Sequence, residues 1–289
     1  MKIAVTGKNG QVVQSLLALA DEDHEVIALG RPDLDLAIPE TIFSALAAVK
    51  PDFIISAAAY TAVDKAEDEP ELAYTVNANG AGAVSAAAAK LNIPIIHLST
   101  DYVFDGRKFG LYSETDQPNP TTIYGASKLQ GEYLVQKHNS KHIILRTAWV
   151  YSPYGNNFLK TILRLGRERD EIKVVSDQHG NPTSAENIAA TILKVCQSVS
   201  KGNFKDWGIY HLVDDLETTW FEWASYIIKI AKYKAIIHPI NSTDYPSKAQ
   251  RPQNSRLSNK KLKQAFSLDI QDWKSSTRLV IDQLKNTQN

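Results

Sequence analysis

A tyrosine and a lysine spaced four residues apart are the first groups in this chain whose types and spacing suit catalysis. In Tyr124-Gly-Ala-Ser-Lys128 the phenol and the ammonium group stand at positions i and i+4, which share one face of a helix. A cation beside a phenol stabilises the phenolate, so Lys128 is predicted to lower the pKa of Tyr124 from about 10 and make it a proton donor and acceptor. Such a pair also occurs by chance, so its meaning depends on its surroundings.

A threonine at the predicted end of a strand is the second signal. The run Ser99-Thr100-Asp101-Tyr102-Val103-Phe104 closes the aliphatic segment 94–99, about one crossover before the tyrosine and lysine. Ligands of open α/β sheets bind at the carboxyl ends of the strands. Thr100 is therefore predicted to join Tyr124 and Lys128 as a catalytic residue.

A glycine-rich turn near the N-terminus is the third signal. Gly7-Lys8-Asn9-Gly10-Gln11 lies between a predicted strand and a predicted helix, where backbone N–H groups approach a pyrophosphate. Glycines in a turn often mark only a turn, and the third small residue of a dinucleotide fingerprint is Val13 here. The helix is therefore expected to pack differently on its strand, while the prediction of a dinucleotide site stands on the combination of signals.

The end of the second predicted strand indicates which nicotinamide cofactor fits. Leu29-Gly30-Arg31 lacks the acidic residue that grips the ribose 2′-hydroxyl of NAD and repels a phosphate. Arg31 is instead predicted to face the 2′-phosphate of NADPH. Asp33 and Asp35 lie close by, so NADH is expected to be tolerated.

Short aliphatic runs and the helical segments between them are expected to position these groups. The runs are apolar on both faces, as a parallel sheet covered on both sides requires, and the alternation is that of a βαβ series. The predicted fold class is α/β, with a doubly wound parallel sheet of the Rossmann type. The predicted strands are 2–6, 25–29, 53–57, 94–99 and 142–147, and the predicted helices are 11–20, 39–49, 71–91 and 125–138.

The regular alternation stops after Arg146, and a smaller C-terminal substrate-binding domain is predicted to begin there. It is expected to be interleaved with the first domain, because 208–213 again has the pattern of a buried strand. Further helices are predicted over 184–195, 220–232 and 271–285, with a loop over 246–258. The predicted domains are 1–148 plus about 183–214 for NADP binding, and about 149–182 plus 215–289 for substrate binding.

Three residues of the second part have two interpretations each. Trp149 follows a buried strand and either lines a sugar or nucleotide pocket or packs in the core. Arg251 lies in a loop rich in Pro and Ser, where it either pairs with a diphosphate or is solvated. Asn157 either caps a helix or binds substrate.

Composition excludes several classes of partner. The 289 residues carry 32 Lys and Arg against 32 Asp and Glu, so neither nucleic acid nor a membrane surface is an expected partner. The expected partner is a small molecule. The single cysteine, Cys196, forms no disulfide within the chain, and no Cys/His spacing suggests zinc. With no secretion signal or membrane-spanning run, a cytoplasmic location is expected.

Blocks spread over the whole chain resemble the extended branch of the short-chain dehydrogenase/reductase superfamily. Besides the segments above, the matching blocks are 57–67, 77–79, 146–151, 156–158, 180–183 and 251–257, of which TAVDKAE and STDYVF are far more specific than the glycine loop. Within the superfamily the chain is similar to reductases of dTDP-linked 4-keto-6-deoxysugars. The resemblance implies NADPH-dependent reduction of the C4 ketone of dTDP-4-dehydro-6-deoxy-L-mannose to dTDP-L-rhamnose.

The resemblance also implies a role for each matched residue. Tyr124 donates a proton to the developing alkoxide, Thr100 hydrogen-bonds that oxygen, and Lys128 also holds the nicotinamide ribose. Cofactor contacts are expected at Gly7, Asn9, Gly10, Gln11, Val12, Arg31, Asp35, Leu36, Ala57, Ala58, Ala59, Tyr124 and Lys128. Substrate contacts are expected at Thr100, Asp101, Tyr102, Trp149, Asn157 and Arg251.

Two other functions stay open at this stage. Another nucleotide-sugar reductase or an epimerase would use the same fold, whereas dehydratases of this branch typically place a carboxylate pair beside the threonine, and here Asp101 is followed by Tyr102. A non-catalytic regulator resembling that of methionine adenosyltransferase is disfavoured by the intact Thr100, Tyr124 and Lys128.

No metal site is predicted. Some relatives are dimers bridged by Mg²⁺ through carboxylates that include one on the helix after the glycine loop, but residues 12–16 hold none. Mg²⁺ depends strongly on carboxylate ligands, so it is not expected to be required. A monomer or a metal-independent homodimer is expected.

Overall fold

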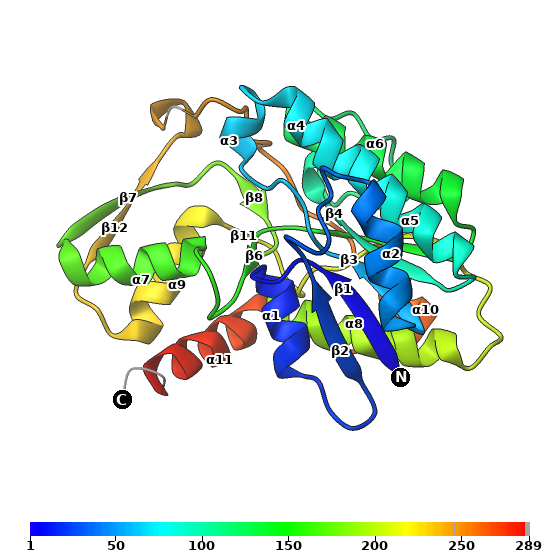
Figure 1. Ribbon diagram of the computed structural model, residues 1–289. Helices are drawn as coiled ribbons and strands as arrows, with labels where there is room; N and C mark the ends of the chain where they lie inside the picture. The colour runs from blue at the N-terminus through cyan, green and yellow to red at the C-terminus, as the bar shows by residue number, and fades with distance from the viewer. Residues whose placement is uncertain (246, 287–289) are drawn as a thin grey trace.

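A six-stranded parallel sheet forms the centre of the molecule (Figure 1). The computed structural model describes residues 1–245 and 247–286. The strand order is β10-β5-β4-β3-β1-β2, and every neighbouring pair runs parallel. The strands are β1 (Lys2–Thr6), β2 (Glu25–Leu29), β3 (Phe53–Ser56), β4 (Ile95–Thr100), β5 (His142–Thr147) and β10 (Gly208–His211). The predicted doubly wound α/β fold is confirmed.

Helices cover both faces of the sheet because its strands are apolar on both sides. In β1, Ile3 and Val5 point into one core with α1 (Gln11–Ala18) and α8 (Ala185–Ser200), while Ala4 points into the other. That second core contains residues of α2 (Glu40–Val49), α5 (Ala81–Lys90) and α6 (Ile123–His138). Figure 1 shows α1 and α8 on one side of the sheet and α5 and α6 on the other. Parallel strands covered in this way leave only the strand ends accessible to a ligand.

The predicted helix over 71–91 is divided into three pieces. It consists of α4 (Pro70–Tyr74), a π-helical turn (Thr75–Gly80) and α5. Asn77 lies in this turn and is almost completely buried; its side chain pairs with both backbone groups of Tyr60 and donates to Ser127 on α6. π-helical turns occur frequently at functional sites, and this one connects the loop after β3 to the helix that carries Tyr124 and Lys128.

A separate hydrophobic core, apart from the two that cover the faces of the sheet, is built from the later part of the chain. It is built from α7 (Phe158–Glu168), α9 (Trp220–Ala231), α11 (Trp273–Asn286) and the parallel pair β7 (Glu171–Val175) and β12 (Ile236–Ile240). The sequence predicts α9 and α11 but not α7, β7 or β12. Figure 1 shows these elements together on the left of the molecule.

Short elements connect the two parts. The segment 247–258 contains only isolated bridges, in agreement with the predicted loop, and residue 246 of that loop and the terminal 287–289 lie outside the described residues. Among the described residues, no helix is both long enough and apolar enough to cross a membrane. The short elements are α3 (Val63–Ala66), α10 (Lys260–Phe266), β6 (Val150–Tyr151), β8 (His179–Gly180), β9 (Thr183–Ser184), β11 (Thr218–Thr219) and the 3₁₀ turns Asp101–Val103 and Ser242–Asp244.

Candidate active site

Thr100 and Tyr124 meet at the carboxyl end of β4. Thr100 ends the strand in extended conformation, and its hydroxyl accepts a hydrogen bond from the backbone N–H of Tyr102 at 3.2 Å. The side chains of Thr100 and Tyr124 are hydrogen-bonded, and the rings of Tyr102 and Tyr124 meet edge to face at 5.5 Å. Gly125 allows this approach, because a Cβ at that position would lie 2.1 Å from the carbonyl oxygen of Tyr102.

Lys128 lies one helical turn further along α6, with its ammonium group buried. Its Nζ donates to the carbonyl oxygen of Leu98 at 2.6 Å and lies 3.4 Å from Nε2 of His97. Burial lowers the pKa of Lys128 to about 8, against the opposing effect of Glu132. The ammonium group is thus held by the backbone of β4, two residues before Thr100.

The sequence predicts a lowered pKa for Tyr124, whereas in the structure its pKa is raised. Burial raises the pKa of Tyr124 above its ordinary value, the nearby Asp101 and Tyr102 raise it further, and the hydrogen bond from Thr100 opposes them. The i, i+4 spacing places Lys128 on the helix as expected, but its proton is donated to the backbone of β4. Spacing on a helix therefore predicts which residues come together but not the balance between burial and charge.

The glycine loop forms the turn that a dinucleotide needs. Gly7 has φ +98°, which favours glycine, and its N–H donates to the carbonyl of Leu29. Gly10 is the N-cap of α1 without any side-chain cap, so the first N–H groups of this helix are available to an anion. The loop follows β1, and β2 and β3 lie on opposite sides of β1 in the sheet. The strand order therefore reverses at β1, and folds of this type bind ligands at such a switch point. These observations fit a dinucleotide phosphate.

The loop after β3 closes the other side of this turn. The hydroxyl of Thr6 accepts hydrogen bonds from the backbone N–H groups of Ala57 and Ala58 at 3.0 and 3.1 Å. Ala58 also contacts the position where a Cβ on Gly7 would lie. The predicted cofactor residues of 57–59 are therefore beside the glycine loop, and Thr6, which the sequence reasoning missed, holds them there.

Arg31 follows β2 and is exposed next to the glycine loop. Lys8 lies beside it: its Nζ donates to the carbonyl of Arg31 at 3.3 Å and pairs with Asp33 at 3.2 Å. The sequence did not indicate a role for Lys8 at the cofactor site, because Lys8 occupies a variable position within the glycine turn. Of the other predicted cofactor residues here, Asp35 accepts from the N–H of Ala37, and Leu36 is buried against the position of Gly80.

Gln11 and Asn157 join the first helix to the second part of the chain. The Asn157 side chain caps α7 by accepting from the N–H of Lys160 at 3.1 Å, and its amide donates to Oε1 of Gln11 at 2.9 Å. Ser152 donates to the same oxygen. Of the two interpretations of Asn157, the structure shows the helix cap, and a contact of this residue with substrate stays a prediction.

A cleft of about 1300 Å³ opens beside Tyr102, whose ring contacts that of Tyr124, while Thr100 and Tyr124 are not among its lining residues. Three of the predicted substrate residues, Tyr102, Trp149 and Arg251, line it, together with Trp220 from α9. The indoles of Trp149 and Trp220 stack with ring centroids 3.6 Å apart. Trp149 is therefore both packed and cleft-facing, and its contact with a sugar or a nucleotide stays a prediction.

Arg251 is held in place by two partners. Its guanidinium donates to the hydroxyl of Tyr102 at 3.0 Å and pairs with Asp64 at 2.6 Å. Asp64 also accepts from the backbone N–H of Ala249 at 3.0 Å. Asp64 belongs to the TAVDKAE block, so the resemblance pointed to its surroundings, but only the fold shows that it orients Arg251 from 187 positions away.

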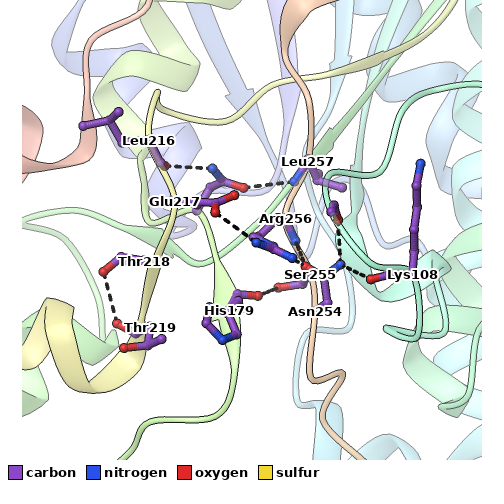
Figure 2. A network of polar contacts seen from close by, with 12 residues as sticks. Lys108, His179, Leu216, Glu217, Thr218, Thr219, Asn254, Ser255, Arg256 and Leu257 are labelled. Atoms are coloured by element: carbon purple, nitrogen blue, oxygen red, sulfur yellow. Dashed lines mark hydrogen bonds and ion pairs between the residues drawn. The ribbon is translucent and has the colours of Figure 1, made fainter.

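The segment that follows Arg251 is held between two parts of the molecule (Figure 2). Asn254 donates to the carbonyls of Lys108 and Gly110, the backbone N–H of Ser255 donates to the carbonyl of His179, and the N–H of His179 donates to the carbonyl of Gln253. The guanidinium of Arg256 contacts Asn254 and pairs with Glu217, as Figure 2 shows. Arg256 therefore serves the attachment of this segment, and the fixed segment places Ser255 in the wall of the cleft.

The side chains of the described chain form no group of three or more His, Cys, Asp or Glu residues suited to a metal ion. Glu186 lies in the first turn of α8, and its N–H donates to the hydroxyl of the N-cap Ser184.

Comparison with known families identifies the chain. A family model described as the RmlD substrate binding domain matches residues 1–286. The chain belongs to the RmlD substrate binding domain family. The resemblance drawn from the sequence is thereby confirmed, since the RmlD match covers nearly the whole chain.

Individual relatives agree with this membership. A dTDP-4-dehydrorhamnose reductase from Sinorhizobium fredii is 46% identical over 286 residues, covering 97% of each chain. The RmlD-family chain also resembles the crystal structure of a dTDP-4-dehydrorhamnose reductase from Clostridium acetobutylicum, with 37% identity, a TM-score of 0.93 and coverage of 99% and 100%. A Bacillus anthracis dTDP-4-dehydrorhamnose reductase in complex with NADP has the same TM-score of 0.93 at 34% identity, with coverage of 98% and 99%.

Proposed function

We propose that this protein catalyses the NADPH-dependent reduction of the C4 ketone of dTDP-4-dehydrorhamnose to dTDP-L-rhamnose, the last step in making that nucleotide sugar. The observation that carries the proposal is the convergence of Thr100, Tyr124 and Lys128 at the end of β4, next to Tyr102, which lines a cleft of about 1300 Å³. The relatives of 34–46% identity described above support the same reaction.

Tyr124 is the proposed proton donor. As negative charge develops on the carbonyl oxygen, the phenol gives it a proton and the Thr100 hydroxyl donates a hydrogen bond to it. The raised pKa of Tyr124 keeps the phenol protonated before the reaction, which suits a donor. Lys128, with a pKa lowered to about 8, lies close enough to its neutral form to exchange a proton near physiological pH.

Residues of the glycine turn and its neighbours are proposed to hold the cofactor. The uncapped N–H groups of α1 face the pyrophosphate, and the exposed cations Lys8 and Arg31 face the 2′-phosphate. When bound, NADPH supplies the hydride. NADPH is expected to be preferred but NADH tolerated, because Asp33 beside Lys8 tempers the positive charge that favours the 2′-phosphate.

The cleft is proposed to hold the nucleotide sugar. Arg251 is oriented by Asp64 and Tyr102 before substrate arrives, so it meets a diphosphate oxygen at little entropic cost. Trp149 provides an aromatic wall for the sugar or the base. The division into a dinucleotide-binding and a substrate-binding domain, the cytoplasmic location and a monomer or metal-independent dimer belong to the same proposal.

A coupled assay tests the function. The protein is incubated with NADPH and dTDP-4-keto-6-deoxyglucose plus a 3,5-epimerase, while the absorbance of reduced nicotinamide is followed and the sugar product is identified. Oxidation of NADPH with formation of dTDP-L-rhamnose is expected. Absence of oxidation, or interconversion of sugars without net oxidation, contradicts the proposal and favours a regulator or an epimerase.

A further inference from the structure

The carboxyl group of Asp101 lies directly behind the catalytic threonine. Its Oδ1 is 3.0 Å from the Thr100 hydroxyl, and only 3% of the residue is exposed. Its other oxygen, Oδ2, is buried and has no hydrogen-bond partner among the described residues. Ser255 lies nearby, but its hydroxyl proton is donated to the carbonyl of His179. A buried carboxylate oxygen without a donor is costly, and protonation removes that cost.

The hydroxyl of Thr100 has one proton and three neighbours. The backbone N–H of Tyr102 donates to it at 3.2 Å and carries no titratable proton, so one lone pair is occupied. The other two neighbours are the Asp101 carboxyl and the Tyr124 phenol. Because a hydroxyl donates one hydrogen bond and accepts two, the protonation of Asp101 decides which neighbour receives the proton of Thr100.

Two arrangements satisfy this count. With Asp101 protonated, its O–H donates to Thr100, and Thr100 donates towards Tyr124 and the reacting oxygen. With Asp101 ionised, Thr100 donates to the carboxylate instead, and the Tyr124 phenol donates to Thr100 and not to a substrate. Only the first arrangement leaves the threonine as a donor and the phenolic proton free.

We propose that Asp101 is a positioning residue, whose protonated carboxyl group turns the hydroxyl of Thr100 towards the reacting oxygen and whose ionised form turns it away. This inference rests on the proposed reductase activity and deepens it. It assigns to Asp101 the control of the direction in which the Thr100 hydroxyl donates its hydrogen bond. It requires no group beyond those of the chain itself.

The surroundings of Asp101 favour the protonated form. Burial raises the pKa of this carboxyl to about 6, while the hydrogen bond from Thr100, the nearby Ser255 hydroxyl and the local backbone oppose the rise. The titratable groups that face the Asp101 carboxyl are the phenols of Tyr102 and Tyr124. Arg251 and Asp64, which lie beyond Tyr102, form an ion pair with each other.

The pH dependence of turnover tests the proposal. The kcat/KM of the wild-type protein is expected to fall as the pH rises through the pKa of Asp101. Asp101→Asn keeps a donor for Thr100 that does not titrate, so this fall should disappear. Asp101→Leu has a similar size without a donor, and its kcat is expected to lie at least roughly tenfold below that of Asp101→Asn. Persistence of the fall in Asp101→Asn, or equal kcat in the two variants, overturns the proposal.

A second measurement does not depend on turnover. In the cofactor-free protein with ¹³C-labelled aspartate, the carboxyl resonance that disappears in Asp101→Asn is expected to titrate with a midpoint near 6. A midpoint at the ordinary value of about 4 overturns the proposal.

Asp214→Asn is the matched control. Burial raises the pKa of the Asp214 carboxyl to about 7, and its hydrogen-bond partners are Asn187 on α8 and Ser184, the N-cap of that helix. Its variant should keep the wild-type pH profile. If the wild-type protein fails to oxidise NADPH at any pH, the proposed function fails, whereas the titration still decides the state of Asp101.

Discussion

A buried ion pair between α6 and the sheet offers the sharpest test of how the candidate active site is supported. Glu132 on α6 accepts two hydrogen bonds from Arg146 on β5, at 2.9 and 2.7 Å, and a third from Ser99 on β4. The side chains of the pair are 0% and 2% exposed. Glu132 therefore ties the helix carrying Lys128 to two strands, and Glu132→Ala leaves the charge of Arg146 in the core without its partner.

The magnitude follows from burial. Removing one partner of a fully buried pair costs about 3–5 kcal/mol of unfolding free energy, because the remaining charge is desolvated and uncompensated. At about 2–4 °C per kcal/mol for a chain of this size class, Tm should fall by roughly 10 °C. The pKa of Lys128 should also fall further, because the charge of Glu132 is what opposes its lowering by burial.

Thermal and denaturant unfolding provide the assay, with a matched exposed pair as the control. Arg164 and Glu168 on α7 form an i, i+4 pair whose side chains are 59% and 52% exposed, and Glu168→Ala should cost less than about 1 kcal/mol. The double change Glu132→Leu with Arg146→Met should recover more than half of the loss, since apolar residues of similar size replace both charges. A Glu132→Ala protein that melts as the Glu168→Ala protein does would refute the reasoning.

Four further outcomes are expected. Tyr124→Phe should lower kcat at least roughly a hundredfold with NADPH binding by fluorescence retained, and near-normal turnover would show that another group donates the proton. Arg31→Ala and Lys8→Ala should each reduce the ratio of kcat/KM for NADPH over NADH, whereas an unchanged ratio in both would remove these cations from the cofactor site. Gly180→Ala places a Cβ 2.4 Å from the indole of Trp149, so KM for the nucleotide sugar should rise, and an unchanged KM contradicts a role for that indole. The light-scattering mass should be the same with excess Mg²⁺ and with EDTA; a dimer that dissociates only on chelation would contradict the expected metal independence.

The sheet was predictable because its signal is local. The strand Phe53–Ser56 is buried at every position and begins with three apolar residues, so it reads as an apolar run whatever lies beside it. The predicted ranges of the six strands agree with the structure to within two residues. The helix over 71–91 was predicted as one piece, since nothing in the local pattern marks the π-helical turn; it forms where Asn77 reaches both Tyr60 and Ser127.

The second part of the chain was harder to predict because its strands depend on distant partners. In β7 and β12, Glu171 pairs with Ile236, so each short strand is stabilised by a segment 65 positions away. β12 also contains Pro239, which cannot donate to a ladder and weakens a strand prediction. Local propensity therefore carried little information there.

The sequence by itself determined the fold class, the glycine turn, and the identity and spacing of Thr100, Tyr124 and Lys128, because periodicity and i, i+4 geometry are properties of neighbouring residues. Only the tertiary structure decided their electrostatics. The direction of the Tyr124 pKa and the burial of Asp101 arise from segments that meet at the strand end from separate parts of the chain. Desolvation depends on everything packed around a group, and that packing exists only once the chain has folded.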